Sequence, residues 1–426
     1  MKRQTQHTQV QVAVIGTGIA GFAASLFARD RGFSVAQFGH TGAISYTTGY
    51  FDLLGALERR VLDDPWSGLA ELRRAEPDHP LARLPVPDIR AAFERFTECL
   101  CEMGIDYTAP GDRNLRGLLP YGVTKPTLSI PQTMRPGIEA LRENAPTLLV
   151  DFEGLQGFSA TEFRLNMADR WPALQSARLT FPGIDVRPVF PEVMARSLET
   201  TEAQEKLAEL IRPLLNGARY VGLPAILGIH APDATRASME RLVGATIFEI
   251  PTIPPAVAGI RLRELFEREL PRRGVRLEPQ IKVSKASFGD TGARLLLHGA
   301  MDDLEVEASA VILATGRFLS GGLRADRHRV RETLLDMPVF QPDDRDAWFS
   351  ADYLDPKGHA LNRAGVETDV AFRPLGPDGH PVSDRLFAAG AVLAHQDWVR
   401  QRCGSGLAIA SAYGAIAAAA EVLGKS

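Results

Sequence analysis

Three glycine-rich turns, each directly after an apolar run of strand length, predict an α/β protein with a Rossmann-like nucleotide-binding fold. The turns lie near the start of the chain, in its last third and close to its end. The expected architecture is a parallel sheet with an added antiparallel meander, interrupted by an α/β insertion domain. Its predicted parts are residues 9–95 and 255–426 for the nucleotide-binding domain and residues 96–254 for the insertion.

The first turn follows Val10–Ile15, an apolar run rich in β-branched residues, and precedes a helix-like segment, Phe22–Arg31. In the motif GTGIAG, Gly16 permits the tight turn, Gly18 lets the backbone approach a pyrophosphate, and Gly21 lets the helix pack closely on the strand. The predicted cofactor-binding residues here are Gly16, Gly18, Ile19, Ala20 and Gly21. A structural tight turn without a ligand is the alternative.

The nucleotide fingerprint lacks one part, the acidic residue that binds a ribose at the end of the second strand. Phe33–Phe38 is the expected strand, and no carboxylate occurs between Asp30 and Asp52. Three interpretations stay open: other groups hold the ribose, the ligand lacks the adenosine half as FMN does, or the site is vestigial. His40, just after this strand, is expected to be a solvated loop residue.

Between the first two turns the pattern changes twice. Residues from about 55 to 140 are rich in proline and predict helices and loops. From Thr147, strand-like runs alternate with helical patterns, which indicates the inserted α/β domain.

The last third returns to the nucleotide-binding pattern. Val257–Leu270 predicts a helix, and the alternating residues 274–308 predict an antiparallel meander. The second turn comprises Ala314, Thr315 and Gly316 at the end of the apolar strand Ser309–Ala314. The third combines Gly390, after the strand-like Leu386–Ala389, with Gly404, Ser405 and Gly406, which open a long helix. In this order, the three turns are typical of two-domain FAD/NAD(P)-binding flavoproteins.

The composition limits the function. The chain has 426 residues, a formal net charge of −4 and three cysteines. That charge gives no general attraction for nucleic acid, and no run of about 18 apolar residues predicts a membrane span. The histidine spacing predicts no metal site, and three thiols are too few for a cysteine-held iron–sulfur cluster. The sequence contains no second GxGxxG motif, so it gives no sign of a separate NAD(P)H-binding domain. If a flavin is bound, its electrons are therefore expected to enter from a substrate or partner and to leave through another polypeptide.

The cysteines themselves predict little chemistry. Cys99 and Cys101 alternate with apolar residues on a probable helix and are expected in the core. Cys403 precedes the last helix, where a thiol pKa can be lowered, but a buried structural role is the favoured interpretation.

Several motifs resemble those of the B subunit of anaerobic glycerol-3-phosphate dehydrogenase, and the resemblance covers nearly the whole chain. The matching pieces are GTGIAG (Gly16–Gly21), TTGYFDLL (Thr47–Leu54), LLVDFEGLQGF (Leu148–Phe158), PTIPPAVAGIRL (Pro251–Leu262), FLSGGL (Phe318–Leu323), VRETLLDMPV (Val330–Val339), LFAAGAVLAHQD (Leu386–Asp397) and QRCGSG (Gln401–Gly406). These pieces are not shared by flavoproteins in general.

The resemblance implies a flavin-binding subunit, with FMN or FAD, in a three-part complex. It implies a sister subunit that carries FAD and oxidises glycerol 3-phosphate to dihydroxyacetone phosphate. It also implies an iron–sulfur subunit that docks on the membrane and passes electrons to quinone. The expected location is therefore cytoplasmic, at the inner face of the membrane through partner subunits. The resemblance leaves open whether this subunit turns over substrate or only relays electrons.

Further candidate residues lie outside the glycine turns. Thr47, Thr48 and Gly49 follow the second strand, where small residues and hydroxyls suit a flavin; a polar turn is the alternative. Arg261, near the start of the helix at Val257–Leu270, is a candidate for gripping phosphate or carboxylate, with a salt bridge as the alternative.

His395 and Asp397 lie between the last strand and the last helix, where a proton-transfer group could face the flavin. The alternatives are an exposed His395 and a helix cap at Asp397. With Arg261, these two residues form the predicted catalytic set.

Two other functions compete with a flavin-dependent dehydrogenase subunit. A non-catalytic scaffold with a degenerate nucleotide fold is suggested by the missing ribose carboxylate and by the absence of Asp after Gly390. A stand-alone flavin oxidase or NAD-dependent dehydrogenase has less support, because a simple NAD fold does not need the late turns.

Overall fold

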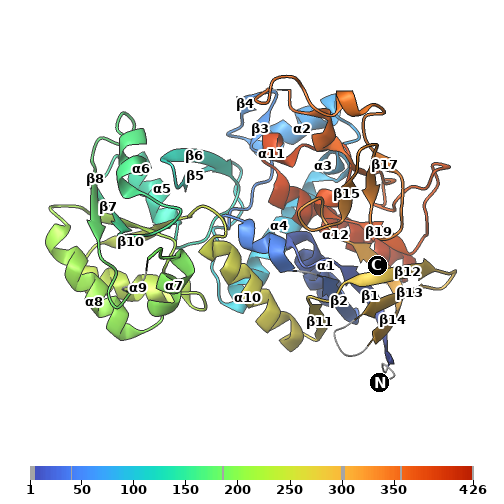
Figure 1. The fold of residues 1–426 in the computed structure, drawn as a ribbon, viewed down its shortest axis with the longest axis horizontal. Helices are drawn as coiled ribbons and strands as arrows, with labels where there is room; N and C mark the ends of the chain where they lie inside the picture. The colour runs from blue at the N-terminus through green and yellow to red at the C-terminus, as the bar shows by residue number, and fades with distance from the viewer. Residues whose placement is uncertain (1–4, 40, 185–186, 299–302, 356, 425–426) are drawn as a thin grey trace. The chain divides into compact units, whose positions relative to one another are not determined.

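The computed structural model describes residues 5–39, 41–184, 187–298, 303–355 and 357–424 (Figure 1). His40 lies outside the described residues. The chain divides into two compact units. Unit 1 comprises Met1–Ala43, Asp52–Phe96 and Phe266–Ser426, and unit 2 comprises Ile44–Phe51 and Thr97–Leu265. The domain limits predicted from the sequence stay a prediction, because compactness does not show which parts fold alone.

Unit 1 is built on a mixed sheet with the strand order β11-β2-β1-β14-β13-β12, in which β19 also pairs with β14. The parallel part follows the predicted pattern: strand, glycine turn, helix, strand. Its elements are β1 (Thr5–Ile15), α1 (Ile19–Asp30), β2 (Val35–Gly39), β11 (Val275–Pro279) and β19 (Leu386–Ala388). This architecture confirms the predicted Rossmann-like fold.

The central strand β14 (Asp303–Leu313) belongs to both parts of this sheet. One edge pairs in parallel with β1 along its whole length. The other edge pairs antiparallel with β13 (Ala293–His298) and then, over its last three residues, in parallel with β19. β12 (Val283–Phe288) completes the meander.

The prediction for the meander was wrong in two respects. Val275–Pro279 pairs in parallel with β2 and is no part of the meander. Alternation with a period of two is the same in both strand directions, so the pattern could not show this. In addition, the two segments expected on either side of Ser309 form the single strand β14.

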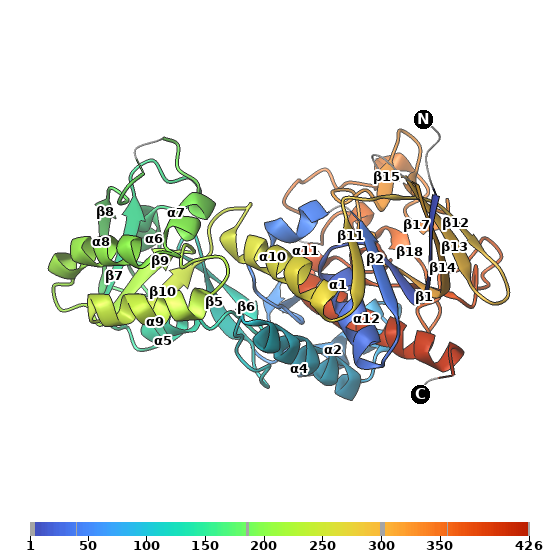
Figure 2. The same ribbon diagram turned by 90° about the horizontal axis from the view of Figure 1, so that it is seen from below.

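The helix α12 (Gly404–Val422) lies beside α1 (Figures 1 and 2). Phe27 of α1 meets Tyr413 of α12 edge to face, with 5.3 Å between ring centroids. By length and composition α12 is apolar enough to cross a membrane, but 67% of its most apolar window is buried inside the structure. Such burial is that of a core helix.

Unit 2 contains a parallel four-stranded sheet with the order β10-β9-β7-β8. Its elements from Arg135 onward are α5 (Arg135–Arg142), β7 (Thr147–Phe152), α6 (Ala160–Asn166), β8 (Leu174–Leu179), α7 (Pro191–Ser197), α8 (Thr201–Ile211), β9 (Tyr220–Pro224), α9 (Pro232–Val243) and β10 (Thr246–Ile250). The central strands β7 and β9 and the edge strand β10 are almost wholly buried, as the apolar runs predict. The expected α/β character of this region is confirmed.

A hairpin in unit 2 was not predicted. β5 (Leu115–Leu119) pairs antiparallel with β6 (Val123–Thr127) inside the stretch expected to hold helices and loops. Pro126 argues against a strand because it has no N–H, yet a two-stranded sheet can accommodate it on an edge.

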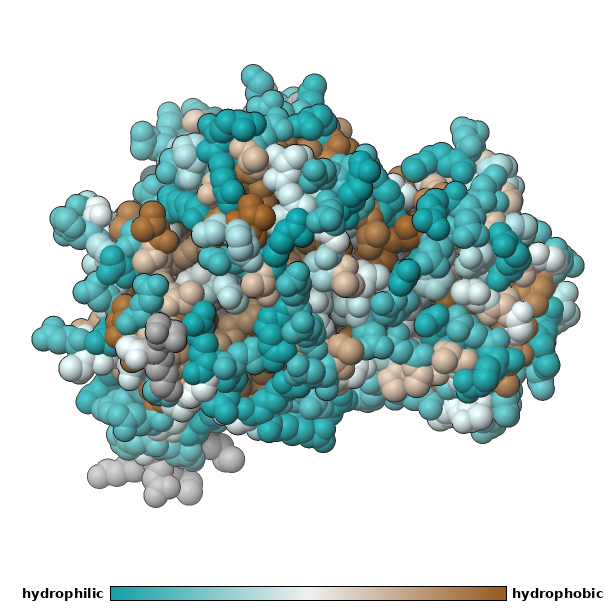
Figure 3. Space-filling view, turned by 180° about the vertical axis from the view of Figure 1, so that it is seen from behind, coloured by the Kyte–Doolittle hydropathy of each residue, from teal (hydrophilic) through white to brown (hydrophobic). Residues whose placement is uncertain are grey.

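The remaining elements are mostly short. They are β3 (Ala56–Leu57), β4 (Arg60–Val61), α2 (Pro65–Ala75), α3 (Pro80–Arg83), α4 (Val86–Met103), α10 (Val257–Arg272), β15 (Leu323–Ala325), β16 (Val330–Glu332), β17 (Val339–Phe340), β18 (Gly365–Val366) and α11 (Trp398–Gln401), with 3-10 turns that include Thr41–Tyr46 and Ala360–Arg363. The surface seen in Figure 3 is mainly hydrophilic, with apolar side chains interspersed.

Candidate functional site

The first glycine turn of unit 1 is too tight for side chains at two positions. Gly16 has φ +132°, and a Cβ there would lie 2.1 Å from the carbonyl oxygen of Ala314. A Cβ on Gly21 would lie 2.0 Å from the carbonyl oxygen of Gly16. Both approaches are to backbone, which cannot move away cheaply. The turn therefore packs closely against α1, as the motif predicts, and against the end of β14.

Gln37 of β2 fixes the same turn from the side. Its Nε2 donates to the carbonyl oxygen of Gly16 at 2.9 Å, and its Oε1 accepts from the hydroxyl of Ser25 at 2.8 Å. Gln37 is fully buried. Sequence analysis overlooked it, although a single amide inside the apolar run Val35–Phe38 was a usable signal. Because both ends of its amide are engaged, Gln37 does not replace the missing ribose carboxylate.

The first glycine turn has free space at one position, the N-terminus of α1, although its other glycines are tightly packed. Gly18 is the N-cap, with extended backbone and no side-chain cap, and a Cβ there would have nothing within 4 Å. The first-turn N–H groups of a helix have no intrahelical acceptor and attract anions. Among the described residues, the buried hydroxyl of Thr17 beside them has no hydrogen-bond partner.

The second turn lies next to the first. The N–H of Ala314 donates to the carbonyl oxygen of Ile15 at 2.8 Å. Gly316 has φ +69°, and a Cβ there would meet the hydroxyl oxygen of Ser320 at 2.2 Å. The buried hydroxyl oxygen of Thr315 has no hydrogen-bond partner in the described part of the chain. The hydroxyls of Thr17 and Thr315 thus lie on two turns that leave neighbouring strands, β1 and β14.

The third predicted turn is held by its neighbours. Gly390 has φ +79°, its N–H donates to Ser411 at 2.8 Å, and a Cβ on it would lie 2.6 Å from the Cβ of Ala20. This places Gly390 against the first turn of α1.

The segment that opens α12 packs on another stretch of unit 1. Ser405 accepts from the N–H of Asp52 at 2.7 Å, and the N–H of Gly406 donates to the Asp52 carbonyl oxygen at 2.7 Å. Gly404 packs near the ring of Trp398, at 3.1 Å for a built Cβ. The three turns therefore belong to one unit, although the chain separates them widely.

These features fit a flavin nucleotide. The open helix N-terminus suits a phosphate, and the hydroxyls of Thr17 and Thr315 are available to hydrogen-bond to a ligand. No carboxylate ends β2, so the ribose, if one is bound, is held by other groups.

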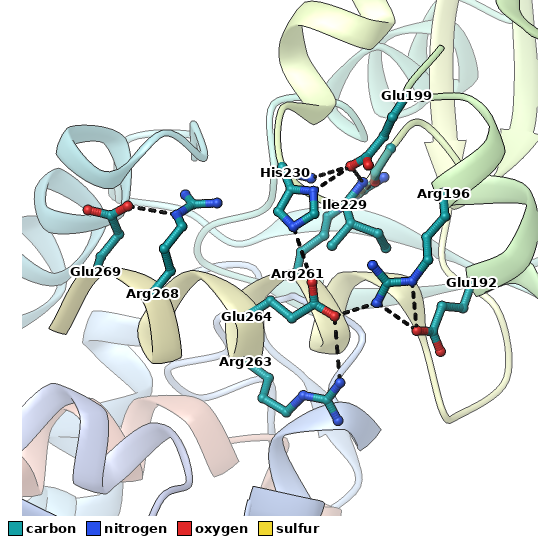
Figure 4. Close-up of polar contacts among 11 residues, drawn as sticks. Glu192, Arg196, Glu199, Ile229, His230, Arg261, Arg263, Glu264, Arg268 and Glu269 are labelled. Carbon is teal, nitrogen blue, oxygen red and sulfur yellow. Dashed lines mark hydrogen bonds and ion pairs between the residues drawn. The ribbon is translucent and has the colours of Figure 1, made fainter. Parts of the chain in front are cut away.

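The predicted residue Arg261 lies in unit 2, on α10 (Figure 4), and its side chain forms a buried ion pair with Glu249. Its two terminal nitrogens contact the two carboxylate oxygens of Glu249, each at 2.7 Å, and its Nε donates to the carbonyl oxygen of Gly228 at 2.8 Å. The side chains are 3% and 0% exposed. Burial opposes the charge of Glu249, but Arg261 and hydrogen bonds outweigh it and hold its pKa below the usual value. Arg261 thus forms the salt bridge that was the alternative interpretation of this residue. A catalytic role of Arg261 stays a prediction.

A second, more exposed charge network lies nearby in unit 2 (Figure 4). Glu264 contacts Arg196 at 2.5 Å and His230 at 3.3 Å. Glu199 contacts the His230 ring at 2.8 Å and accepts the N–H groups of Ile229 and His230. Burial acts against this charge, but those donors prevail and lower the pKa of Glu199. Glu264 and Glu192 both pair with Arg196, and Glu199 accepts hydrogen bonds from backbone N–H groups, which is the pattern of a stabilising network.

His395 and Asp397 make local contacts in unit 1. His395 has φ +63°, lies 2.9 Å from Glu367, and its ring contacts Phe340 with 4.1 Å between centroids. Asp397 caps α11 by accepting the N–H of Arg400 at 3.2 Å, which is the capping alternative. Their proton-transfer role stays a prediction.

Thr47, Thr48 and Gly49 belong to unit 2 and form a polar turn. The hydroxyl oxygen of Thr47 accepts the N–H of Gly49 at 3.2 Å, and that of Thr48 accepts the N–H of Tyr50 at 3.4 Å. Gly49 has φ +83° and lies close to Ala258. Their part in cofactor binding also stays a prediction.

His79 is a buried polar residue that sequence analysis overlooked. Its Nδ1 accepts the N–H of Leu81 at 3.1 Å, so its Nε2 carries the proton and donates to the side-chain oxygen of Gln401 at 3.1 Å. Burial lowers its pKa to about 3, so the ring is neutral at pH 7. His79 and Gln401 are far apart in sequence, so no local pattern signals this pair.

The cysteines divide by exposure. Cys99 and Cys403 are buried as expected, and burial raises the pKa of Cys403 rather than lowering it. The prediction for Cys101 was wrong, because this residue is exposed on α4. Among the described residues, no group of three or more His, Cys, Asp or Glu side chains is placed to hold a metal ion.

The glycine turns and the sheet define a flavoprotein of the FAD-binding class. The family model described as "FAD binding domain" matches residues 11–407. Two relatives narrow the class. The B subunit of the anaerobic glycerol-3-phosphate dehydrogenase of Vibrio cholerae serotype O1 is 29% identical over 95% of each chain. The probable B subunit of the same enzyme from Halobacterium salinarum is 30% identical over 97% of this chain and 98% of its own length. The chain belongs to the family of anaerobic glycerol-3-phosphate dehydrogenase B subunits, as the sequence motifs predict.

Among solved structures, the 3-ketosteroid Δ1-dehydrogenase of Sterolibacterium denitrificans, in complex with 1,4-androstadiene-3,17-dione, matches 97% of this chain and 100% of its own. The identity is 12% and the TM-score 0.44. At that level the likeness adds nothing to the assignment.

Proposed function

We propose that the chain is the flavin-binding subunit of a quinone-linked anaerobic glycerol-3-phosphate dehydrogenase complex. It supports the oxidation of glycerol 3-phosphate to dihydroxyacetone phosphate. The observation that carries the proposal is the full-length likeness to relatives that have that subunit's name. The open N-terminus of α1, with the unpartnered hydroxyls of Thr17 and Thr315, supports it.

The partners in this proposal are a sister subunit with FAD and an iron–sulfur subunit that docks on the membrane. Three cysteines cannot hold a four-thiolate cluster, so electrons leave this chain through another polypeptide. The proposed location is the cytoplasm, at the inner membrane face through those partners.

The residues have distinct proposed roles. The first-turn N–H groups after Gly18 bind phosphate, and Thr17 and Thr315 hydrogen-bond to the nucleotide. A bound flavin supplies reversible acceptance of a hydride. His395 is proposed to move the substrate hydroxyl proton, while Asp397 positions the loop through its cap on α11.

The test is a visible absorbance spectrum of the purified chain, with mass identification of any released cofactor. A flavin spectrum that bleaches on addition of glycerol 3-phosphate, in the presence of the sister subunit, is expected. A colourless chain that takes up neither FMN nor FAD contradicts the proposal.

A non-catalytic scaffold is the second candidate. It is favoured by the absence of a carboxylate at the end of β2 and by Ala391, which follows Gly390 where many flavoproteins have Asp. It predicts that the assembled complex keeps its activity after Gly18→Asp, which would place a negative charge at the phosphate position. Loss of activity with intact assembly excludes the scaffold.

A further inference from the structure

Unit 1 exposes a group of large apolar side chains that its own fold does not bury. Three of them are more than 70% exposed: Leu319 (74%), Tyr353 (84%) and Leu354 (77%). We call the following residues the apolar patch: Phe318, Leu319, Phe349, Tyr353, Leu354 and Trp398. Single exposed apolar residues are ordinary, but a cluster of them marks an interaction site.

The three segments that carry the patch contact one another. Arg317, just before Phe318, donates to the carbonyl oxygens of Leu361 and Asn362 at 2.9 and 2.5 Å. The amide of Asn362 donates to Asp397, next to Trp398, at 3.0 Å. These bonds connect the segment after Gly316 to the start of α11.

The middle segment is tied to the same structure. The ring of His359 contacts Phe349 and Tyr353, with centroids 5.5 and 6.3 Å apart. Arg400 of α11 donates to the carbonyl oxygen of Asp355 at 2.6 Å. The patch is therefore one region of the unit 1 surface rather than scattered residues.

A strongly basic hairpin, formed by β15, β16 and the turn between them, borders the patch. Its exposed cationic or ionisable side chains are Arg324, Arg327, His328, Arg329 and Arg331. Arg331 pairs with Asp326 at 2.9 Å. Within the described ranges, Arg324, Arg327 and Arg329 have no ion-pair partner. The side chain of Arg345, three residues before the buried Trp348, donates to the carbonyl oxygen of Asp326 at 3.0 Å and joins the hairpin to the middle segment.

This chemistry favours a protein partner over two other occupants. Aromatic side chains beside arginine are typical of the central residues of protein interfaces. An anionic membrane would repel the exposed Asp343, Asp344, Asp346 and Asp352 of the middle segment. A symmetric contact of two copies centred on the hairpin would bring its arginines against the same arginines.

We propose that the apolar patch and the basic hairpin are the docking surface for another polypeptide of the dehydrogenase. The partner surface is apolar at its centre and carries carboxylates opposite Arg324, Arg327 and Arg329. The inference rests on the proposed function only for the identity of that partner.

The test uses the full chain, tagged and co-expressed with the proposed FAD-bearing and iron–sulfur subunits from the same source. Leu319→Ser with Leu354→Ser should weaken association by about tenfold or more. Arg327→Glu with Arg329→Glu should weaken it as well, with a smaller dependence on salt than the unmodified chain shows. Co-purification and sedimentation of the complex measure both effects.

The matched control is Leu165→Ser with Leu210→Ser, which changes two exposed leucines of unit 2 (60% and 41% exposed). It should leave association unchanged. Equal association of the patch variants and the control overturns the proposal. Patch-dependent binding to vesicles of phosphatidylcholine and phosphatidylglycerol without the partners, or a patch-dependent dimer, also overturns it.

The flavin content and thermal unfolding of each variant are measured in parallel. Unchanged values show that the patch variants remain folded. A colourless chain that still assembles through the patch contradicts the proposed flavin function and leaves the docking surface intact. A flavin-bearing chain that assembles without the patch contradicts only the docking surface.

Discussion

The glycine turn of unit 1 and the Arg261 centre of unit 2 are both buried polar regions, but they differ in how completely their groups are paired. Around Arg261, the guanidinium contacts Glu249 and Gly228, and Glu249 also accepts the N–H of Leu227. At the glycine turn, the hydroxyls of Thr17 and Thr315 have no hydrogen-bond partner within the described ranges, and a Cβ on Gly18 would have nothing within 4 Å there.

This difference distinguishes buried polar groups that stabilise the fold from buried polar groups that are available to bind a ligand. In a buried ion pair each charge is compensated by the other. Removing one member leaves the other charge buried without a partner, which strongly lowers the free energy of unfolding. Unpartnered donors at a helix N-terminus lower stability slightly and are retained where a ligand completes them. Substitutions at Glu249, Gly21 and Gly18 test this contrast, and one at His79 tests a further buried polar group. They follow in order of decreasing expected effect on the free energy of unfolding.

Glu249→Gln should have the largest effect, a loss of about 3 kcal/mol, because it leaves the charge of Arg261 buried without an opposite charge. Urea unfolding of the chain measures this loss. The double variant Glu249→Leu with Arg261→Met should recover much of it, since no charge is then buried. A loss below about 1 kcal/mol in the single variant would mean that the pair is solvated.

Gly21→Ala should lower the free energy of unfolding by about 2–3 kcal/mol, because its Cβ would overlap the backbone carbonyl of Gly16. The control is Gly18→Ala, at a position with ordinary φ and free space, which should change it by about 0.5 kcal/mol or less. Equal effects of the two substitutions would show that the turn is not tightly packed.

His79 should make the folded chain less stable in acid. Its folded pKa of about 3 lies below the unfolded value of 6.5, so only the unfolded chain takes up this proton as the pH falls below 6.5. The contribution is fully present above pH 6.5 and falls by about 2 kcal/mol by pH 5. Unfolding measured at both pH values should show a smaller change in His79→Gln. An unaltered pH dependence in that variant speaks against a neutral buried ring.

Gly18→Asp should leave stability unchanged or slightly higher, because Asp is a favoured N-cap and interacts well with the helix dipole. The same carboxylate should repel a phosphate and reduce flavin content by about tenfold or more. Gly18→Ser, an uncharged cap, should lose less flavin. Retention of flavin by the Asp variant would place the phosphate elsewhere.

The sequence predicted the elements whose signals are local. Val10–Ile15 followed by glycines, and Ser309–Ala314 followed by Thr315-Gly316, are each interpretable within about ten residues. It could not show the direction of Val275–Pro279, since alternation is the same in parallel and antiparallel strands. Partners distant in sequence escaped as well: Glu249 for Arg261 and Gln401 for His79 become neighbours only through the fold.

During synthesis, β1 cannot pair with β14 until the ribosome has made β14. Ile15 aligns with Leu313, about 300 residues further along the chain. At about 5–20 residues per second, synthesis needs roughly 15–60 s to supply that partner. Throughout this interval the apolar run Val10–Ile15 lacks one of its strand neighbours, whereas the residues of unit 2, which end at Leu265, are complete before Leu313 is made. The central pairing of unit 1 can therefore form only after almost three quarters of the chain has been made.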